Sequence, residues 1–286
     1  MTEEQNQNPP GGAPEEAVVA SPRRWWILVA LSLATIIIQF DQSGMTLALP
    51  HIQAELGATT QQLQWVMDAY SLALASVVLT AGAVSDRYGR RKVFLLGIAV
   101  LAAGSLIGAL APDANVVIAG RALMGVGGAM FMPGTLSIIT HVFDRVTRPT
   151  AIGIWGAVTS LGVIVGPLIS GAVLQIWHWR GIFVLNVVMA AIAFTGAAAL
   201  VPESRDPHPR RLDILGAVLA GAGLLGVIYA VIHSSSDGVT SPVVLAAAGV
   251  GAAALVLFWL HSTRGEVSMF EDRKSTRLNS SHVKLS

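Results

Sequence analysis

Cysteine is absent from this 286-residue sequence, and charged residues are scarce, at 12%. The lack of cysteine excludes disulfide frameworks, thiolate metal sites and cysteine nucleophiles. An average soluble domain carries about 25% charged residues, so this chain has too few to build a water-soluble surface. Hydrophobic residues make up 53% of the sequence, and this content excludes disorder over most of its length. A soluble enzyme is therefore nearly excluded.

Nothing in the basic residues or histidines indicates a nucleic-acid partner, a cofactor or a metal. The net charge is +1, and residues 272–286 alone hold four basic side chains against one acidic one. Lys92 is the only lysine before that segment, so no phosphate-binding lysine loop exists. The seven histidines include no pair at metal-ligand spacing. We expect no nucleic acid, cofactor or metal, and we place the histidines His51, His178 and His233 at outer interfaces.

Long apolar runs dominate the rest of the sequence. A helix needs roughly 20 apolar residues to cross a bilayer, and short links rich in Gly, Pro, Asn, Asp and Ser separate the runs. The runs cover 25–49, 64–84, 93–111, 115–139, 150–173, 181–201, 214–233 and 243–261. These runs predict an all-α polytopic membrane protein, in which the first helix ends at Pro50.

The runs suggest a division of the chain into five parts. The predicted parts are a disordered cytoplasmic tail (1–22), a six-helix bundle (23–202), a cytoplasmic loop (203–212), two additional transmembrane helices (213–262) and a cytoplasmic end (263–286). The first part lacks the basic start and short apolar core of a signal peptide. From Asp272 the sequence looks like a translated sequencing-library adapter, which predicts a non-native tail; a native cytoplasmic tail is the alternative.

The distribution of basic residues predicts the orientation in the membrane, since cytoplasmic loops carry an excess of Lys and Arg. With the N-terminus in the cytoplasm, Arg180 is the one basic residue in an outer link. Twelve basic residues then lie in inner segments: Arg23, Arg24, Arg87, Arg90, Arg91, Lys92, Arg145, Arg148, Arg205, Arg210, Arg211 and Arg264. We expect a multi-pass protein of the cell inner (plasma) membrane with a cytoplasmic N-terminus.

Three ionisable residues lie inside the predicted spans: Asp41, Asp68 and Arg121. Such groups are costly in a bilayer and usually face a cavity or a partner. At ~1.5 Å per residue, Asp41 lies ~14 Å from the outer surface, and Asp68 and Arg121 each lie ~9 Å from it. Because all three residues lie in the outer half of the bilayer, we predict that they share one polar cavity. Either these groups exchange protons and a cationic substrate, or Asp41 and Arg121 form a pair that only orders the helices.

The short loop Gly82–Lys92 has the most specific pattern in the sequence. Its residues Gly82, Asp86, Arg87, Gly89 and Arg90 closely resemble the loop signature GxLaDrxGrk of the major facilitator superfamily. Arg121–Ala129 is similar to the RxxqGxgaa segment of the same family, with Met124 in place of glutamine. The resemblance implies a conformational-switch loop in which Asp86 contacts the second half of a transporter, so Asp86 is expected to lack its partner here.

Residues of the fifth run are similar to the antiporter signature gxxxGPxxGG. The matching residues are Gly162, Gly166, Pro167 and Gly171, with Ser170 in place of one glycine. Small residues let helices approach closely, and proline inside a helix bends it. The resemblance implies a bend typical of exporters; ordinary helix packing is the alternative.

Three further segments resemble the fourteen-helix drug/proton antiporters: Phe40–Pro50, Trp65–Leu72 and Trp179–Asn186. The resemblance runs from about Trp25 to His261. It implies that Asp41 handles protons or substrate, that Asp68 recognises organic cations and that Arg121 takes part in proton coupling. Leu212–Gly216 resembles the start of that branch's extra helix pair, although a twelve-helix relative would also have a seventh and eighth helix.

The expected function is therefore that of a proton-coupled multidrug exporter and not an enzyme. Its expected partners are a small lipophilic, cationic substrate, protons, the lipid bilayer and the missing C-terminal half of the same transporter. Alternating access needs two bundles around one midplane site, so the fragment is expected to be inactive alone. A metabolite exporter of the same superfamily and a non-transporting membrane sensor remain as alternatives.

Overall fold

The computed structural model describes residues 22–204, 213–234 and 238–266, and every regular element in these ranges is a helix. The helices are α2 (Arg23–Leu56), α3 (Thr60–Tyr88), α4 (Arg90–Ala109), α5 (Ala114–Val142), α6 (Arg148–Ile176), α7 (Arg180–Leu200), α8 (Ile214–Ser234) and α9 (Pro242–Glu266). Eight helices in the described ranges are long and apolar enough to cross a membrane, which confirms the predicted all-α class. The predictions for the tail 1–21, for most of the loop 203–212 and for residues from 267 onward fall outside these ranges.

Local sequence explains where the helices begin and end. Thr59 closes a capping box with Gln62, and this cap starts α3 four residues before the apolar run. The prediction that Pro50 ends the first helix is wrong. α2 passes through Pro50 and stops at Gly57, whose φ of 61° is left-handed. A proline removes one backbone donor and bends a helix, but glycine in this conformation is what terminates it.

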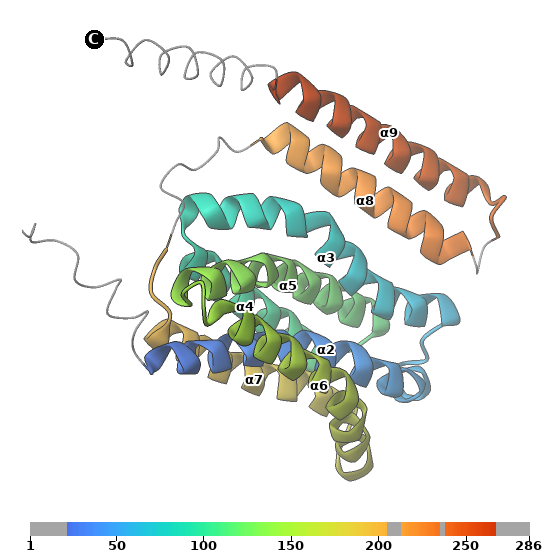
Figure 1. Ribbon diagram of the computed structural model, residues 1–286. Coiled ribbons are helices and arrows are strands. Elements are labelled where there is room, and N and C mark those ends of the chain that lie inside the picture. Colours follow the sequence, from blue (N-terminus) through green and yellow to red (C-terminus); the bar gives the residue numbers. More distant parts are fainter. Residues whose placement is uncertain (1–21, 205–212, 235–237, 267–286) are drawn as a thin grey trace, which may run out of the picture.

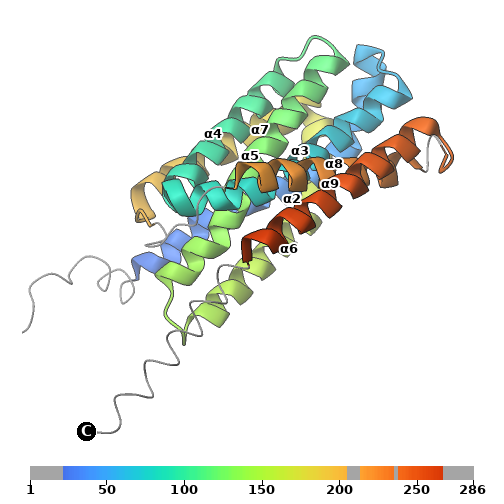
Figure 2. The ribbon, with the colours of Figure 1, turned by 90° about the horizontal axis from the view of Figure 1, so that it is seen from above.

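The first six helices form two groups of three (Figure 1). α5 packs between α3 and α4, while α2 packs against α6 and α7, and the contact of α4 with α7 joins the groups. Small residues allow the closest approach: a Cβ on Gly104 of α4 would lie 2.7 Å from the Gly120 carbonyl oxygen of α5. α8 lies on α3, and α9 lies outside α8, so this pair is attached to one side of the bundle (Figures 1 and 2).

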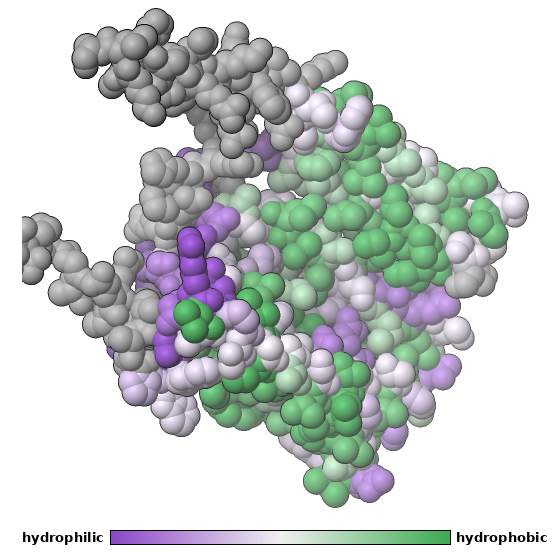
Figure 3. Space-filling model, in the orientation of Figure 1, coloured by the Kyte–Doolittle hydropathy of each residue, from purple (hydrophilic) through white to green (hydrophobic). Residues whose placement is uncertain are grey.

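The outer faces of the helices are apolar. Leu168 of α6 is 70% exposed and Val250 of α9 is 66% exposed. Hydrophobic residues cover most of the visible face, while hydrophilic ones gather mainly toward the ends of the helices (Figure 3). Because lipid tails are the solvent that suits such a surface, the chain is a multi-pass membrane protein.

Candidate functional site

The centre of the bundle holds a buried ion pair. Asp41 of α2 and Arg121 of α5 are 1% and 0% exposed, and Oδ2 of Asp41 accepts a hydrogen bond from Nη1 of Arg121. The second carboxylate oxygen, Oδ1, accepts a hydrogen bond of 2.7 Å from Nδ2 of Asn186 on α7. Three helices thus meet at one carboxylate. The structure brings Asp41 and Arg121 together as the sequence predicted.

The helix α3 holds the arginine from the other side. Nε of Arg121 donates to the backbone oxygen of Val66 at 2.8 Å. The guanidinium carbon lies 4.7 Å from the centre of the Tyr70 ring, a distance at which the ring face attracts a cation. Val66 and Tyr70 are one helical turn apart, so both belong to the face of α3 that points at α5.

Several buried polar atoms around the ion pair lack a hydrogen-bond partner among the described residues. Among the described residues, Nη2 of Arg121, Oη of Tyr70 and Oδ1 of Asn186 are buried without a hydrogen-bond partner. Buried polar atoms without partners are costly, and such groups are common where a site takes up water, a proton or an ion. A proton on Asp41 would remove the negative charge that holds Arg121, so this arrangement can couple protonation to movement of the arginine.

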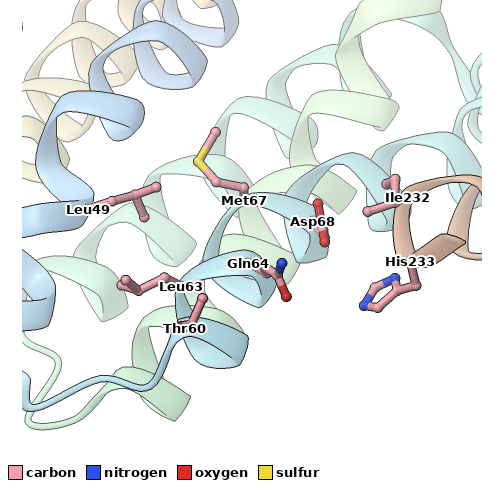
Figure 4. A pocket seen from close by; sticks show the side chains of 8 residues that line it. All are labelled: Leu49, Thr60, Leu63, Gln64, Met67, Asp68, Ile232 and His233. Atoms are coloured by element: carbon pink, nitrogen blue, oxygen red, sulfur yellow. The ribbon is translucent and has the colours of Figure 1, made fainter. Parts of the chain in front are cut away.

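Asp68 lies apart from this pair. It follows Val66 by two residues on α3, which turns it about 200° around the helix, away from α5. Asp68 lines a pocket of about 300 Å³ that contains neither Asp41 nor Arg121 (Figure 4). The expectation of one cavity shared by all three ionisable residues is therefore wrong. The depth counted along the sequence placed the three residues at similar heights in the membrane. It did not determine which face of its helix each residue occupies.

The Asp68 pocket is formed by α2, α3 and α8. Four residues are polar and four are apolar: Thr60, Gln64, Asp68, His233, and Leu49, Leu63, Met67, Ile232. His233 is 4% exposed and lies one residue before the end of α8, and its expected place at an outer interface stays a prediction. Its ring stacks on Tyr229 with 4.1 Å between ring centres and an interplanar angle of 12°. The ring centre of Trp65, on α3, lies 5.5 Å from that of His233.

The predicted switch loop connects α3 to α4 at Gly89, whose φ of 115° favours glycine. Asp86 accepts a hydrogen bond of 3.0 Å from Nε of Arg90, so it has a partner within this chain, contrary to the prediction. The backbone nitrogen of Arg90 donates to the oxygen of Ser204 at 2.9 Å, and that of Arg91 donates to Oε1 of Glu203 at 3.3 Å. The loop is thereby tied to the segment that follows α7.

Gly82 and Arg87, the two other predicted switch-loop residues, make looser contacts. A Cβ on Gly82 would lie 3.7 Å from the Pro133 side chain, which is ordinary van der Waals contact. The guanidinium of Arg87 lies 5.8 Å from the ring centre of its neighbour Tyr88. Neither contact shows a switch, so that role remains a prediction.

The predicted bend residues of α6 divide into packed and open positions. A Cβ on Gly166 would collide with the Ser43 hydroxyl of α2, and one on Gly162 would lie 3.0 Å from the Gln39 Cβ. Pro167 lies inside the helix. At Gly171 a Cβ would meet nothing within 4 Å among the described residues, so close packing does not explain that glycine.

The end of the bundle opposite the switch loop carries a second polar cluster. Glu55 at the end of α2 accepts hydrogen bonds from Nε1 of Trp179, at 2.8 Å, and from Nη1 of Arg180, and His178 also contacts it. Nη2 of Arg180 donates to the oxygen of Ala111 at 2.8 Å. This cluster joins the ends of α2, α4 and α7.

At the end of the bundle that carries the switch loop, Asp144 follows α5. The backbone nitrogen of Thr147 and the Thr147 hydroxyl donate to Asp144, and Arg24 lies 3.2 Å from it. These hydrogen bonds, with that of the Thr147 backbone largest, hold the pKa of Asp144 below its ordinary value.

A family model matches most of the helices described above. The model described as "Major Facilitator Superfamily" matches residues 31–214, which is most of the six-helix bundle and the first residue of α8. The chain belongs to the Major Facilitator Superfamily. Membership of this superfamily indicates a transporter rather than an enzyme.

Several curated proteins are similar to the chain. The "Multidrug efflux pump LfrA" of Mycolicibacterium smegmatis is 36% identical over 88% of this chain and 50% of its own length. The "Puromycin resistance protein pur8" of Streptomyces alboniger is 35% identical over 85% of this chain and 48% of its own length. The "Methylenomycin A resistance protein" of Bacillus subtilis is 34% identical over 82% and 50%. The chain spans about half the length of these relatives.

Solved structures of peptide transporters share the fold. The POT family transporter PepTSo matches with a TM-score of 0.61 and 14% identity, over 85% of this chain and 54% of that one. A sulfate-bound peptide transporter POT matches with a TM-score of 0.59 and 18% identity, over 76% and 53%. At such identities the likeness concerns the fold alone.

Two side chains of these sites were not predicted from the sequence. Asn186 is the last residue of the segment Trp179–Asn186, which resembles the fourteen-helix antiporters. A neutral amide inside an apolar run nevertheless gave no signal of its role. His233 lies at the end of α8, a helix without an internal charge. Only the packing of the neighbouring helices shows that Asn186 bonds to Asp41 and that His233 lines the Asp68 pocket.

Proposed function

We propose that the chain is the N-terminal part of a proton-driven exporter of lipophilic, cationic drugs. The relatives named as efflux and resistance proteins support drug export, and the half-length match supports a missing second half. The Asp41–Arg121–Asn186 centre supports proton coupling. This centre is the single observation that carries the proposal, because three helices converge on one buried carboxylate.

The coupling step follows from electrostatics. Ionised Asp41 and cationic Arg121 together are neutral, which makes their burial tolerable. When Asp41 takes a proton from the outer side, Arg121 becomes an uncompensated buried charge, and it cannot lose its own proton. The arginine must then find another partner or water, and this requirement moves the Arg121 side chain away from Asp41. Release of the proton to the inside restores the pair.

Asp68 supports a cationic substrate. Its carboxylate lines a separate pocket together with four apolar side chains, and this combination suits a ligand that is lipophilic and positively charged. The proton and the substrate would then act at two distinct carboxylates. Their occupancies would be linked through α3, which carries Asp68 and contacts Arg121 through Val66.

The remaining parts of the proposal concern the whole transporter. We place it in the inner (plasma) membrane with its N-terminus in the cytoplasm, since the basic residues lie on that side. A fourteen-helix parent is proposed because α8 and α9 form a pair attached outside the six-helix bundle. The second half would complete the cavity, and the fragment alone would not transport.

The test measures drug-stimulated proton flux in membrane vesicles that carry the complete transporter. Asp41→Asn should abolish the flux, because an amide cannot take up the proton. Asp68→Asn should reduce drug stimulation and leave the response to uncharged drugs. Unchanged coupling in both variants would overturn the proposal. Competition between drugs and metabolites for uptake distinguishes the metabolite-exporter alternative.

A further inference from the structure

A second cavity lies between the six-helix bundle and the α8–α9 pair, along the line where α8 lies on α3 (Figures 1 and 2). Ten residues from four helices line it, among them Trp65 on α3, Ala122 on α5, Tyr229 on α8 and Ala247 on α9, and its volume is about 500 Å³. This cavity, called the Tyr229 groove below, shares no lining residue with the Asp68 pocket. The proton and drug sites proposed above therefore leave it unused.

The groove exists because small side chains line it on every helix. Half of its lining residues are alanine or glycine: Ala69, Ala73, Ala122, Ala247 and Gly226. Contacts at its two ends hold the helices apart. At one end a Cβ on Gly221 of α8 would lie 2.5 Å from the backbone oxygen of Ser76 on α3, so the two backbones already touch. At the other end the ring centres of Trp65 and Tyr229 lie 5.9 Å apart.

The groove extends along one leaflet of the membrane. The 29 residues of α3 span ~44 Å at ~1.5 Å per residue, so this helix extends ~7 Å beyond each side of a hydrocarbon core ~30 Å thick. Trp65 lies ~8 Å along α3 from its first residue, Thr60, and so stands at the edge of the core. Ala73 lies ~20 Å from Thr60, near the middle of the membrane. The groove thus follows the course of an acyl chain from the interface to the membrane centre.

The polarity of the lining changes in the same direction as that of a lipid. None of the ten residues is charged, and the only polar side-chain atoms are Nε1 of Trp65 and Oη of Tyr229. Both atoms belong to the end at the edge of the core, where Trp and Tyr stand at the level of lipid headgroups. Within the part of the chain that the structure describes, neither atom has a hydrogen-bond partner. Both can therefore donate to the ester or phosphate oxygens of a lipid.

We propose that the Tyr229 groove holds one acyl chain of a membrane phospholipid, which fills the space between the bundle and the α8–α9 pair. An empty groove would be costly, because its walls would lack contacts. Water does not suit it, since a buried water needs two to four polar partners. The bilayer around the helices supplies acyl chains at a far higher concentration than any solute. The proposal is independent of drug export, because a lipid that stays between the helices is not transported.

Photo-crosslinking tests where the lipid lies. The 286-residue chain is placed in nanodiscs of phosphatidylethanolamine and phosphatidylglycerol, with some phosphatidylethanolamine that carries a diazirine toward the methyl end of one acyl chain. Irradiation and peptide mass spectrometry locate the attached lipid. Leu72, which lines the groove and is only 4% exposed, should carry several-fold more label than Val250, which is 66% exposed on α9. Equal or lower label on Leu72 would mean that something other than a lipid occupies the groove, and would overturn the proposal.

A filling substitution provides the matched comparison. Ala122→Leu should occupy the groove and lower the label on Leu72 several-fold. Ala246→Leu, the same change at an exposed alanine beside Ala247, should leave that label unchanged. Equal label on Leu72 in both variants would contradict the proposal.

Lipid release tests the polar end without filling the groove. Native mass spectrometry after transfer to detergent should show one phospholipid retained by the wild-type chain. Tyr229→Phe keeps the ring and removes the hydroxyl, so release should become about fivefold faster, as expected for one hydrogen bond. No retained lipid, or equal release rates, would overturn the proposal even if Ala122→Leu fails to fold.

Discussion

The two intramembrane aspartates of this chain differ in their surroundings. Asp41 is enclosed by α2, α5 and α7, and both of its carboxylate oxygens accept hydrogen bonds. Asp68 lies at the seam between α3 and α8, beside a pocket and without a hydrogen bond among the described residues. Two aspartates at similar depth thus differ in their contacts: Asp41 joins three helices through its hydrogen bonds, whereas Asp68 faces a pocket.

This difference would let one bundle separate the two tasks that we propose for it, proton uptake and substrate binding. A carboxylate whose oxygens are all engaged responds to a proton by releasing its partners. A carboxylate that faces a pocket responds to a ligand. Because α3 contacts both sites on different faces, occupancy at one can influence the other without a shared cavity.

The largest effect should come from breaking the enclosed pair. Asp41→Ala should lower the free energy of unfolding by about 3–5 kcal/mol, because it leaves the buried Arg121 charge uncompensated. Asp68→Ala, the matched change at the open site, should cost no more than about 1 kcal/mol. Denaturant unfolding of the chain in micelles measures both. The double variant Asp41→Leu/Arg121→Met should be more stable than Asp41→Ala; equal losses at the two aspartates would contradict the comparison.

The amide that supports Asp41 should have the next largest effect. Asn186→Leu should cost about 1.5–3 kcal/mol, the usual worth of a hydrogen bond to a charged group. Asn115 provides a matched control, since it is exposed and accepts its hydrogen bond from Gln62 at 3.1 Å. Asn115→Leu should change the free energy of unfolding by no more than about 0.5 kcal/mol. If both substitutions cost the same, Asn186 does not support the buried carboxylate.

Two glycines of α6 extend the comparison of enclosed and open positions. Gly166→Ala should destabilise the chain by about 1–3 kcal/mol, because the added methyl displaces the Ser43 hydroxyl from its hydrogen bond to Gln39. Gly171→Ala should stabilise it by up to about 1 kcal/mol, since alanine favours helix and the position is open. Melting temperatures in micelles give the two signs. Equal shifts in one direction would show that α2 and α6 are not in close contact there.

The smallest effect should come from Asp144, a surface carboxylate whose hydrogen bonds lie outside the membrane spans. Its pKa is lowered, chiefly by the Thr147 backbone hydrogen bond, so the unfolded chain takes up this proton first. Its stabilising contribution is therefore present above about pH 4, the ordinary aspartate value, and is lost as the pH falls through the lower folded pKa. Asp144→Asn should flatten the fall in melting temperature below pH 4. An unchanged acid profile would contradict this assignment.

Much of the fold could be predicted from the sequence because apolar run length dictates membrane helices. Asp41 and Arg121 could also be predicted to meet, since charges within such runs need partners. The orientation of Asp68 could not, because depth along a helix says nothing about which neighbour it faces. The continuation of α2 through Pro50 was missed because local sequence signals a break there, while packing on Ala48 and Ile52, both buried, favours the helix.

The contacts at the two ends of α7 restrict how the bundle can move. Beyond its C-terminus, Glu203 and Ser204 hold the loop before α4, and at its N-terminus Arg180 reaches Glu55 and Ala111. A hinge between the helices of the bundle would have to break the contacts at both ends of α7 together. Rotation of all six helices as one rigid body breaks neither set of contacts, so such a motion would need no change at the ends of α7.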